Sequence, residues 1–180
     1  MAESHGPGSA LSALAGVVMR NDGIVDGFTL GTVRVSGDDA THSVVQMAAS
    51  LRRDDISYVL VWGTIISRYN LVDVGEVSSS LGVPVLGLSN RRRRSAEAAI
   101  SAKFPERLGR YRALAPRRAI LLHTGSTVYA RISGCTGTQA ASLLNTVTRQ
   151  GRMPEPVRLA RLLAGAARLS LGGGSAAVDV

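Results

Sequence analysis

The chain of 180 residues contains little cysteine, almost no lysine and no long hydrophobic run. Because Cys135 is its single cysteine, an internal disulfide and a cysteine-based zinc site are excluded, and a reducing, cytoplasmic compartment is expected. No apolar run approaches the roughly 20 residues that cross a bilayer, and no signal peptide opens the chain, so no membrane partner is expected. The motifs GxxxxGKS/T, HExxH and GxSxG are also missing, which removes the common signatures of phosphate loops, zinc peptidases and serine hydrolases.

Length and composition favour one domain. With 45% hydrophobic residues, the chain is long enough for one core and too short for two ordinary domains. Residues 1–13 are small and polar without an apolar face, which predicts a flexible or truncated N-terminus. The glycine-rich residues 170–180 predict a flexible tail, so residues 14–169 are expected to form the domain.

The net charge of +8 is concentrated in one segment. Residues 91–118 hold nine arginines and Lys103 against Glu97 and Glu106, whereas the remainder of the chain holds eleven basic and eleven acidic residues. Arginine forks suit phosphate oxygens, so this segment predicts a nucleic-acid partner. The alternative is a solvated arginine-rich face without a ligand. The candidate contact residues of the segment are Arg91, Arg92, Arg93, Arg94, Arg117 and Arg118.

A buried strand followed by a helix is predicted in the middle of the chain. Residues 58–62, YVLVW, form a short apolar run without alternation, which is typical of a strand covered on both faces. From Asn70 the apolar residues follow helical spacing to Gly82, and residues 83–88 form a second apolar strand. Since α/β folds bind ligands beyond the carboxyl ends of their strands, a site is expected between Trp62 and Asn70.

The remaining segments predict hairpins and helices on either side of this unit. Residues 21–23, Asn-Asp-Gly, mark the turn of a first hairpin, and residues 124–126, Thr-Gly-Ser, mark a second. A helix is expected after Asp38 and Asp39, where one carboxylate caps the helix and the other favours its dipole, or both bind a metal. Two further helices close the chain, so the order of elements predicts a mixed α/β sheet.

Three segments match a known pattern in the same order. They are DGIVDGFTLGTVRVSGDDAT at residues 22–41, YVLVWGTIISRYNLVDV at residues 58–74, and residues 124–161 with Pro154, Glu155 and Pro156 followed by Arg158. Together they resemble the archaeal endonuclease dU family and its distant relative endonuclease V, over residues 14–168. The resemblance implies a ribonuclease H-like α/β fold, with antiparallel first strands and parallel later ones. It also implies metal-dependent cleavage of DNA near deaminated bases such as uracil.

Most of the metal ligands that the resemblance implies are replaced. Ala2 and Glu3 fall where the family carries two aspartates, and Trp62 before Gly63 falls where it carries an aspartate. Arg161 stands where endonuclease V has a histidine or aspartate after its Pro-Glu-Pro motif. Neither an indole nor a guanidinium coordinates Mg²⁺, so no metal site is assigned, and cleavage with Mg²⁺ or Mn²⁺ is expected to be impaired.

The carboxylates that remain are Glu3, Asp38 and Asp39, which are therefore the candidate catalytic residues. The first strand of the family pattern is also expected to be missing, and one explanation of this is that the true start lies upstream of Met1.

Other residues match the family and also have ordinary structural explanations. Asn70 and Asp73 match a family asparagine and aspartate, yet they are also predicted as N-cap and N3 of the following helix. Glu155 and Arg158 lie at the entry to the last helix, where proline and glutamate favour helix initiation. Arg158 is a further candidate nucleic-acid contact, and the expected cleft lining is Trp62, Gly63, Asn70, Asp73 and Glu155.

Three functions from different classes follow from these residues. The first is a deoxyuridine-type endonuclease, and the second is an impaired relative that binds nucleic acid, expected to be DNA. The third is a scaffold that forms homo-oligomers. The replaced ligands favour binding over cleavage.

Overall fold

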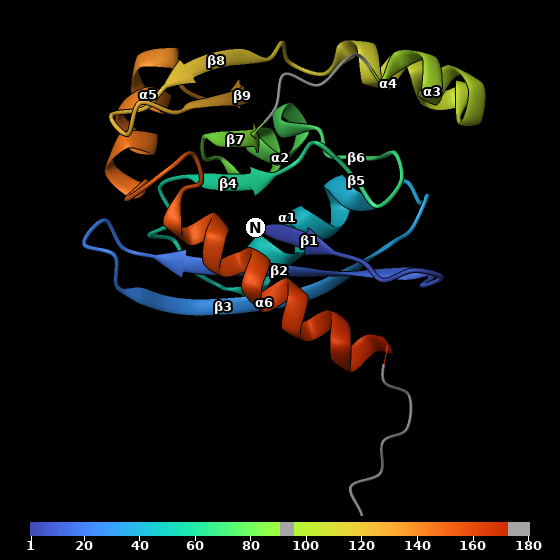
Figure 1. Ribbon diagram of the computed structural model, residues 1–180, viewed down its shortest axis with the longest axis horizontal. Coiled ribbons are helices and arrows are strands. Elements are labelled where there is room, and N and C mark those ends of the chain that lie inside the picture. Colours follow the sequence, from blue (N-terminus) through green and yellow to red (C-terminus); the bar gives the residue numbers. More distant parts are fainter. Residues whose placement is uncertain (91–95, 173–180) are drawn as a thin grey trace, which may run out of the picture.

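The computed structural model describes residues 1–90 and 96–172. Its first strands, β1 (Ala2–Ser4), β2 (Leu11–Met19) and β3 (Val25–Arg34), form an antiparallel sheet in the order β1-β2-β3 (Figure 1). The turn predicted at residues 21–23 joins β2 to β3, and there the N–H of Gly23 donates to the carbonyl of Arg20 at 2.9 Å. The first predicted hairpin is therefore confirmed.

Four further strands continue the sheet. The parallel pair β4 (Val59–Trp62) and β7 (Val85–Ser89) is followed by the antiparallel β9 (Thr127–Ser133) and β8 (Arg118–Leu121), in the order β4-β7-β9-β8. The N–H of Trp62 donates to the carbonyl of Met1 at 3.0 Å, and the Met1 nitrogen donates to the carbonyl of Leu60 at 2.5 Å, so β1 lies beside β4. β4 is therefore the middle strand of one mixed sheet, and the buried strand predicted at residues 58–62 is confirmed.

The side chains of β4 alternate between two cores. Val59 and Val61 pack in the cluster beneath α1 (Ala40–Ser50) and α2 (Val74–Leu81). Leu60 packs in the opposite cluster, which includes residues of α5 (Gly137–Val147) and α6 (Glu155–Gly172). In Figure 1, α6 crosses in front of β1 and β2, and α1 lies behind them. Because both faces of β4 are covered, every position of the strand is apolar.

Local signals set the ends of two helices. At the start of α5, Thr136 Oγ1 accepts the N–H of Gln139 at 3.2 Å while Gln139 Oε1 accepts the N–H of Thr136 at 2.9 Å. The carboxylate of Asp73 accepts two N–H groups in the first turn of α2, which ends at Gly82 as predicted. The predicted start of α2 at Asn70 is wrong, because Asn70 lies in a strand and its amide binds another helix.

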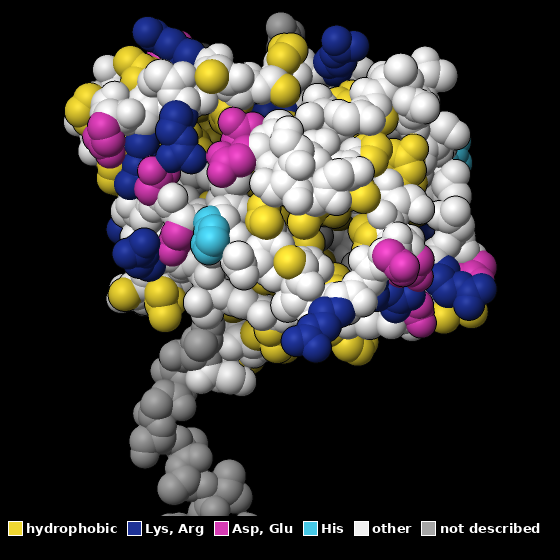
Figure 2. All heavy atoms as spheres, turned by 180° about the vertical axis from the view of Figure 1, so that it is seen from behind, with side chains coloured by type: hydrophobic (Ala, Val, Ile, Leu, Met, Phe, Trp, Pro, Cys, Tyr) yellow, Lys and Arg dark blue, Asp and Glu magenta, His cyan; other side chains and the backbone are white. Residues whose placement is uncertain are grey.

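Residues 91–118, here called the connector, contain three short helices in their described part. These are α3 (Glu97–Lys103), the 3-10 helix η1 (Pro105–Arg107) and α4 (Leu108–Ala113), at the upper right of Figure 1. Pro105 begins η1 and separates it from α3. Figure 2 shows the molecule from behind, with charged side chains of both signs gathered at the end that carries these helices. Two ion pairs lie there, Arg110 with Asp38 and Arg112 with Glu97.

The N-terminus differs from the prediction of a loose end. Ala2 is buried and pairs with Ala15 of β2, and Met1 contacts β4 through backbone hydrogen bonds. The prediction that the first family strand is missing is therefore wrong. A strand of three small or polar residues has no apolar alternation of its own, and it forms because a partner strand lies on each side.

The C-terminal end extends further than predicted, since α6 runs to Gly172 and includes the start of the predicted tail. Residues 173–180, the rest of that tail, lie outside the described residues. Within the described part of the chain, no helix combines the length and apolar character needed to cross a membrane.

Candidate functional site

A cavity of about 310 Å³ lies at the carboxyl ends of β4 and β7, the region where the sequence predicted a site. Trp62 and Gly63, two of the predicted cleft residues, line it. Gly63 has a φ of 94°, which glycine adopts without strain and which takes the chain from β4 into a small hairpin. That hairpin consists of β5 (Ile65–Ile66) and β6 (Asn70–Leu71), and β5 together with Tyr69 of the turn forms one wall of the cavity.

The charged lining of this cavity is mainly basic. Among the described residues that line it, Glu3 is the one carboxylate, against Arg117 of the connector, Arg131 of β9 and Arg161 of α6. Burial lowers the pKa of Arg131, and the neighbouring charge of Arg117 adds to this effect. Three guanidinium groups around one carboxylate favour an anionic ligand.

Glu3 is held by hydroxyl groups at the wall of the cavity. Ser67 Oγ donates to Glu3 Oε1 at 2.9 Å and lies 2.8 Å from Oγ of the buried Ser12. His5 Nδ1 lies 3.1 Å from the same carboxylate oxygen. These contacts fix the predicted catalytic carboxylate beside the turn between β5 and β6.

That turn has an unusual backbone. Ser67, Arg68 and Tyr69 have φ angles of 41°, 58° and 71°, three consecutive residues in the left-handed region. Each such residue costs on the order of 1–3 kcal/mol, so surrounding contacts must hold the turn in place. Conformations of this kind are concentrated at functional sites, which agrees with the position of the turn in the cavity wall.

Arg107 of the connector supplies contacts that hold the turn. Its side chain is buried and donates to the carbonyl of Tyr69 at 3.2 Å and to the carbonyl of Ser36 at 2.8 Å. The guanidinium also lies 4.2 Å from the ring centroid of Phe104. The connector therefore stabilises the cavity wall through a residue that was not predicted as functional.

Replacing Arg107 with methionine should reduce the free energy of unfolding by about 3 kcal/mol, because two carbonyls lose a charged donor. Urea unfolding followed by circular dichroism measures this loss. The control is Arg112→Met, which removes an exposed pair with Glu97 and should cost less than about 1 kcal/mol. Equal losses in the two variants would contradict a special role for Arg107.

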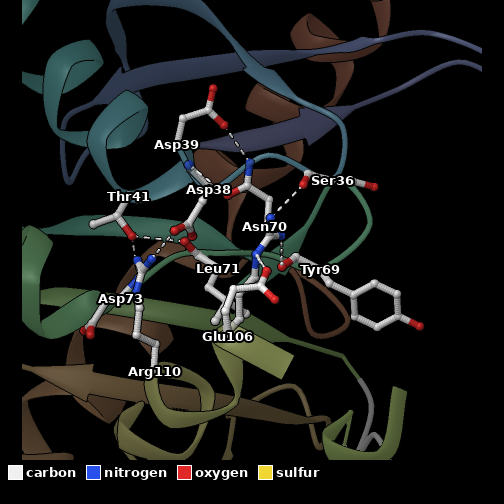
Figure 3. A network of polar contacts seen from close by, with 12 residues as sticks. Ser36, Asp38, Asp39, Thr41, Tyr69, Asn70, Leu71, Asp73, Glu106 and Arg110 are labelled. Atoms are coloured by element: carbon white, nitrogen blue, oxygen red, sulfur yellow. Dashed lines mark hydrogen bonds and ion pairs between the residues drawn. The ribbon is translucent and has the colours of Figure 1, made fainter. Parts of the chain in front are cut away.

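Asp38 and Asp39 lie outside this cavity, in a polar network beside α1 (Figure 3). The carboxylate of Asp39 accepts hydrogen bonds from Asn70 Nδ2 at 2.7 Å and from the N–H of Arg34 at 3.2 Å. Although Asp39 occupies the N-cap position of α1, its side chain does not cap the helix. Asn70 Oδ1 instead accepts the N–H of Ala40 at 2.9 Å, so the prediction of an aspartate cap is wrong.

Both aspartates have structural partners. Asp38 forms an ion pair with Arg110 of the connector at 2.5 Å. Burial alone raises the pKa of Asp39, but the hydrogen bonds from Asn70 and Arg34 outweigh burial and lower it below its usual range. The structure thus does not bring these carboxylates into the cavity lining with Glu3.

The other predicted residues are distributed around the molecule. Asn70, Asp73 and Glu155 do not line the cavity, because the first two bind helix ends and Glu155 pairs with Arg158 at 2.5 Å. Arg118 is exposed on β8. Residues 91–94, the predicted arginine contacts, lie outside the described residues.

The sequence matches the endonuclease dU family over residues 1–168. The chain belongs to this family. A UPF0215 protein of Pyrobaculum calidifontis is 31% identical over 172 residues, which cover 93% of this chain and 94% of that protein. A UPF0215 protein of Thermococcus gammatolerans is 29% identical, over 85% of this chain and 80% of its own length.

Solved structures share the fold of this family member. A protein of unknown function from Archaeoglobus fulgidus superposes with a TM-score of 0.74 at 25% identity, over 92% of this chain and 95% of that one. Endonuclease V from Ciona intestinalis, in complex with a 24mer DNA containing an inosine followed by a ribo-adenosine, has a TM-score of 0.61 at 12% identity, over 94% and 84%. Endonuclease V from Streptomyces avermitilis has a TM-score of 0.61 at 14% identity, over 95% and 80%. The predicted ribonuclease H-like fold is confirmed.

The resemblance described above implies a divalent metal ion, but the cavity residues of this family member do not fit one. Mg²⁺ requires several oxygen ligands, whereas Trp62 and Arg161 share the cavity with Glu3 and supply none. In residues 1–90 and 96–172, no group of three or more His, Cys, Asp or Glu side chains is placed to hold a metal ion.

Three residues of the site were missed by sequence reasoning. Arg131 is a charged residue within an otherwise uncharged strand, TVYARIS. A charge at such a position could have identified Arg131 as a candidate site residue. Ser89 and Arg107 have no such signal, because their roles depend on contacts between distant segments.

Proposed function

We propose that this protein binds nucleic acid in the cavity at the ends of β4 and β7, with uracil-containing DNA as the ligand. We further propose that its metal-dependent cleavage is impaired. The observation that carries both parts is the composition of the cavity, which combines Trp62 and three arginines with Glu3 alone as a carboxylate. Membership of the endonuclease dU family and the fold shared with a DNA-bound endonuclease V support a nucleic-acid ligand.

Each cavity residue has a chemical role in this proposal. The guanidinium groups of Arg117, Arg131 and Arg161 bind phosphate oxygens, and the indole of Trp62 offers a face on which a displaced base stacks. Glu3 by itself neither holds a metal nor activates water at the rate that a metal-bound water provides. The substitution of metal ligands therefore separates binding from cleavage.

A titration of a uracil-containing duplex with Mg²⁺ and with Mn²⁺, scoring binding and nicking in the same tube, tests the proposal. We expect binding that favours uracil over a matched thymine duplex, without nicking above a protein-free control. If three phosphates are contacted, affinity should fall roughly forty-fold between 50 and 200 mM salt. Nicking with either metal would instead identify an active endonuclease. Equal affinity for the two duplexes would reject recognition of the deaminated base.

The binding measurement should be repeated on Arg161→Ser over a range of salt concentrations. The slope of log affinity against log salt concentration should be smaller in magnitude by about 0.9 than in the wild type, because one phosphate contact is lost. Arg168→Ser is the matched control, since it removes the same charge two turns further along α6, away from the cavity lining. An unchanged slope in Arg161→Ser would contradict a phosphate contact there.

The third function that the sequence suggested, a scaffold that forms homo-oligomers, stays a prediction.

A further inference from the structure

The charge of Arg131 is buried and has no carboxylate within ion-pair distance among the described residues, while Asp73 attracts it from further away. Its side chain is 7% exposed, and Nη1 donates to the carbonyls of Leu114, at 3.1 Å, and Ala115. Nε is buried and has no hydrogen-bond partner, and Arg131 forms no ion pair with a carboxylate of the described residues. Because a guanidinium remains protonated in proteins, this arrangement leaves a buried positive charge that an anion would stabilise.

A second unsatisfied donor lies on the neighbouring strand. Ser89 Oγ is buried and has no hydrogen-bond partner in the part of the chain that the structure describes. In the register of β7 and β9, Gly87 lies opposite Arg131 and Ser89 lies opposite Tyr129. Ser89 and Arg131 are thus diagonal neighbours on one face of the sheet, roughly 7–8 Å apart. Gly87 has no side chain of its own there, and Thr64 and Val74 pack over it. Both residues line the cavity.

We propose that Arg131 and Ser89 form an anion subsite that takes one phosphoryl group within the cavity. A phosphoryl group supplies acceptor oxygens for the guanidinium Nε–H and for the serine hydroxyl at the same time. Its negative charge also neutralises the guanidinium, which an uncharged water molecule does not do. Arg117, which lines the same cavity, strengthens the positive potential there. The subsite deepens the proposed function, but it requires no DNA and is testable with inorganic phosphate alone.

The decisive variant is Ser89→Glu, which places a carboxylate within reach of Arg131 on the adjacent strand. In the wild type, inorganic phosphate should raise the melting temperature more than sodium chloride of equal ionic strength does. In Ser89→Glu, the melting temperature without phosphate should rise, and phosphate affinity should fall at least about a hundredfold, because the carboxylate occupies the subsite and repels phosphate.

Ser79→Glu is the matched control, since it makes the same change in net charge at an exposed position of α2. It should respond to phosphate as the wild type does. A wild type that does not respond to phosphate would overturn the proposal. So would a Ser89→Glu variant that responds as strongly as the control. Ser89→Ala, which removes one donor without adding charge, should weaken phosphate binding several-fold and covers the case in which Ser89→Glu does not fold.

Oligonucleotides separate the two sources of the phosphoryl group. Tighter binding of a 5′-phosphorylated strand than of the same strand with a 5′-hydroxyl would assign the subsite to a strand end. Equal binding that inorganic phosphate displaces would assign it to an internal phosphate, and both results support the subsite. Phosphate binding by a protein that does not bind uracil-containing DNA would reject the proposed function and retain the subsite. DNA binding without phosphate binding would reject the subsite and retain the proposed function.

Discussion

Replacing Asn70 with aspartate should reduce the free energy of unfolding by about 3–5 kcal/mol at pH 7. Asn70 is 0% exposed, and its Nδ2 donates to Asp39 Oδ1 at 2.7 Å. In the variant, a carboxylate oxygen faces the Asp39 carboxylate at this distance, so two negative charges share a partly buried site. Urea unfolding at pH 7 measures the loss.

The pH dependence of this variant has a defined sign. Repulsion raises the pKa of one carboxylate of the pair above its unfolded value, so the destabilisation is present at neutral pH and decreases as the pH falls through that raised pKa. In the wild type the sign is opposite, because the pKa of Asp39 is lowered in the folded protein. That contribution is present above the unfolded pKa of 3.8 and is lost as the pH falls further.

The double variant Asn70→Asp with Asp39→Asn is the control, because it exchanges donor and acceptor while retaining one charge. Most of the lost stability should return, which a double-mutant cycle expresses as a favourable coupling between the two positions. A double variant as unstable as Asn70→Asp alone would show that the hydrogen bond between these side chains does not account for the effect.

Replacing Trp62 and Arg161 together with aspartate should create a site for a divalent metal. With Glu3, these changes place three carboxylates around the same cavity and remove one positive charge and one bulky ring. Oxygen ligands of this kind suit Mg²⁺ and Mn²⁺, so calorimetry should detect Mn²⁺ binding at least about a hundredfold tighter than in the wild type. The physical reason is that the fold already directs these positions toward one cavity.

The matched control for this experiment carries asparagine at both positions, which reproduces the loss of the indole and guanidinium without adding negative charge. It should bind Mn²⁺ far more weakly than the aspartate variant. Equal metal binding by the two variants would contradict the idea that carboxylates at positions 62 and 161 are sufficient to create a metal site in this cavity.

The candidate site was predictable only in outline. The resemblance placed Glu3, Trp62 and Arg161 in one site, and the structure brings them to the same cavity. It also grouped Asp38 and Asp39 with Glu3, whereas the structure directs both aspartates to Arg110, Arg34 and Asn70. A residue's position in the chain does not determine which way its side chain points, and that direction decides whether it joins a site.

The sequence by itself determined several local elements: the apolar run of β4, the two hairpin turns and the end of α2 at Gly82. These follow from backbone preferences and periodicity over a few residues. Only the tertiary structure decided that β1 forms, that Asn70 caps α1, that Arg107 holds the strained turn and that Arg131 is buried. Each of these depends on partners many positions away in the chain, where burial and unsatisfied hydrogen bonds, rather than local propensity, set the free energy.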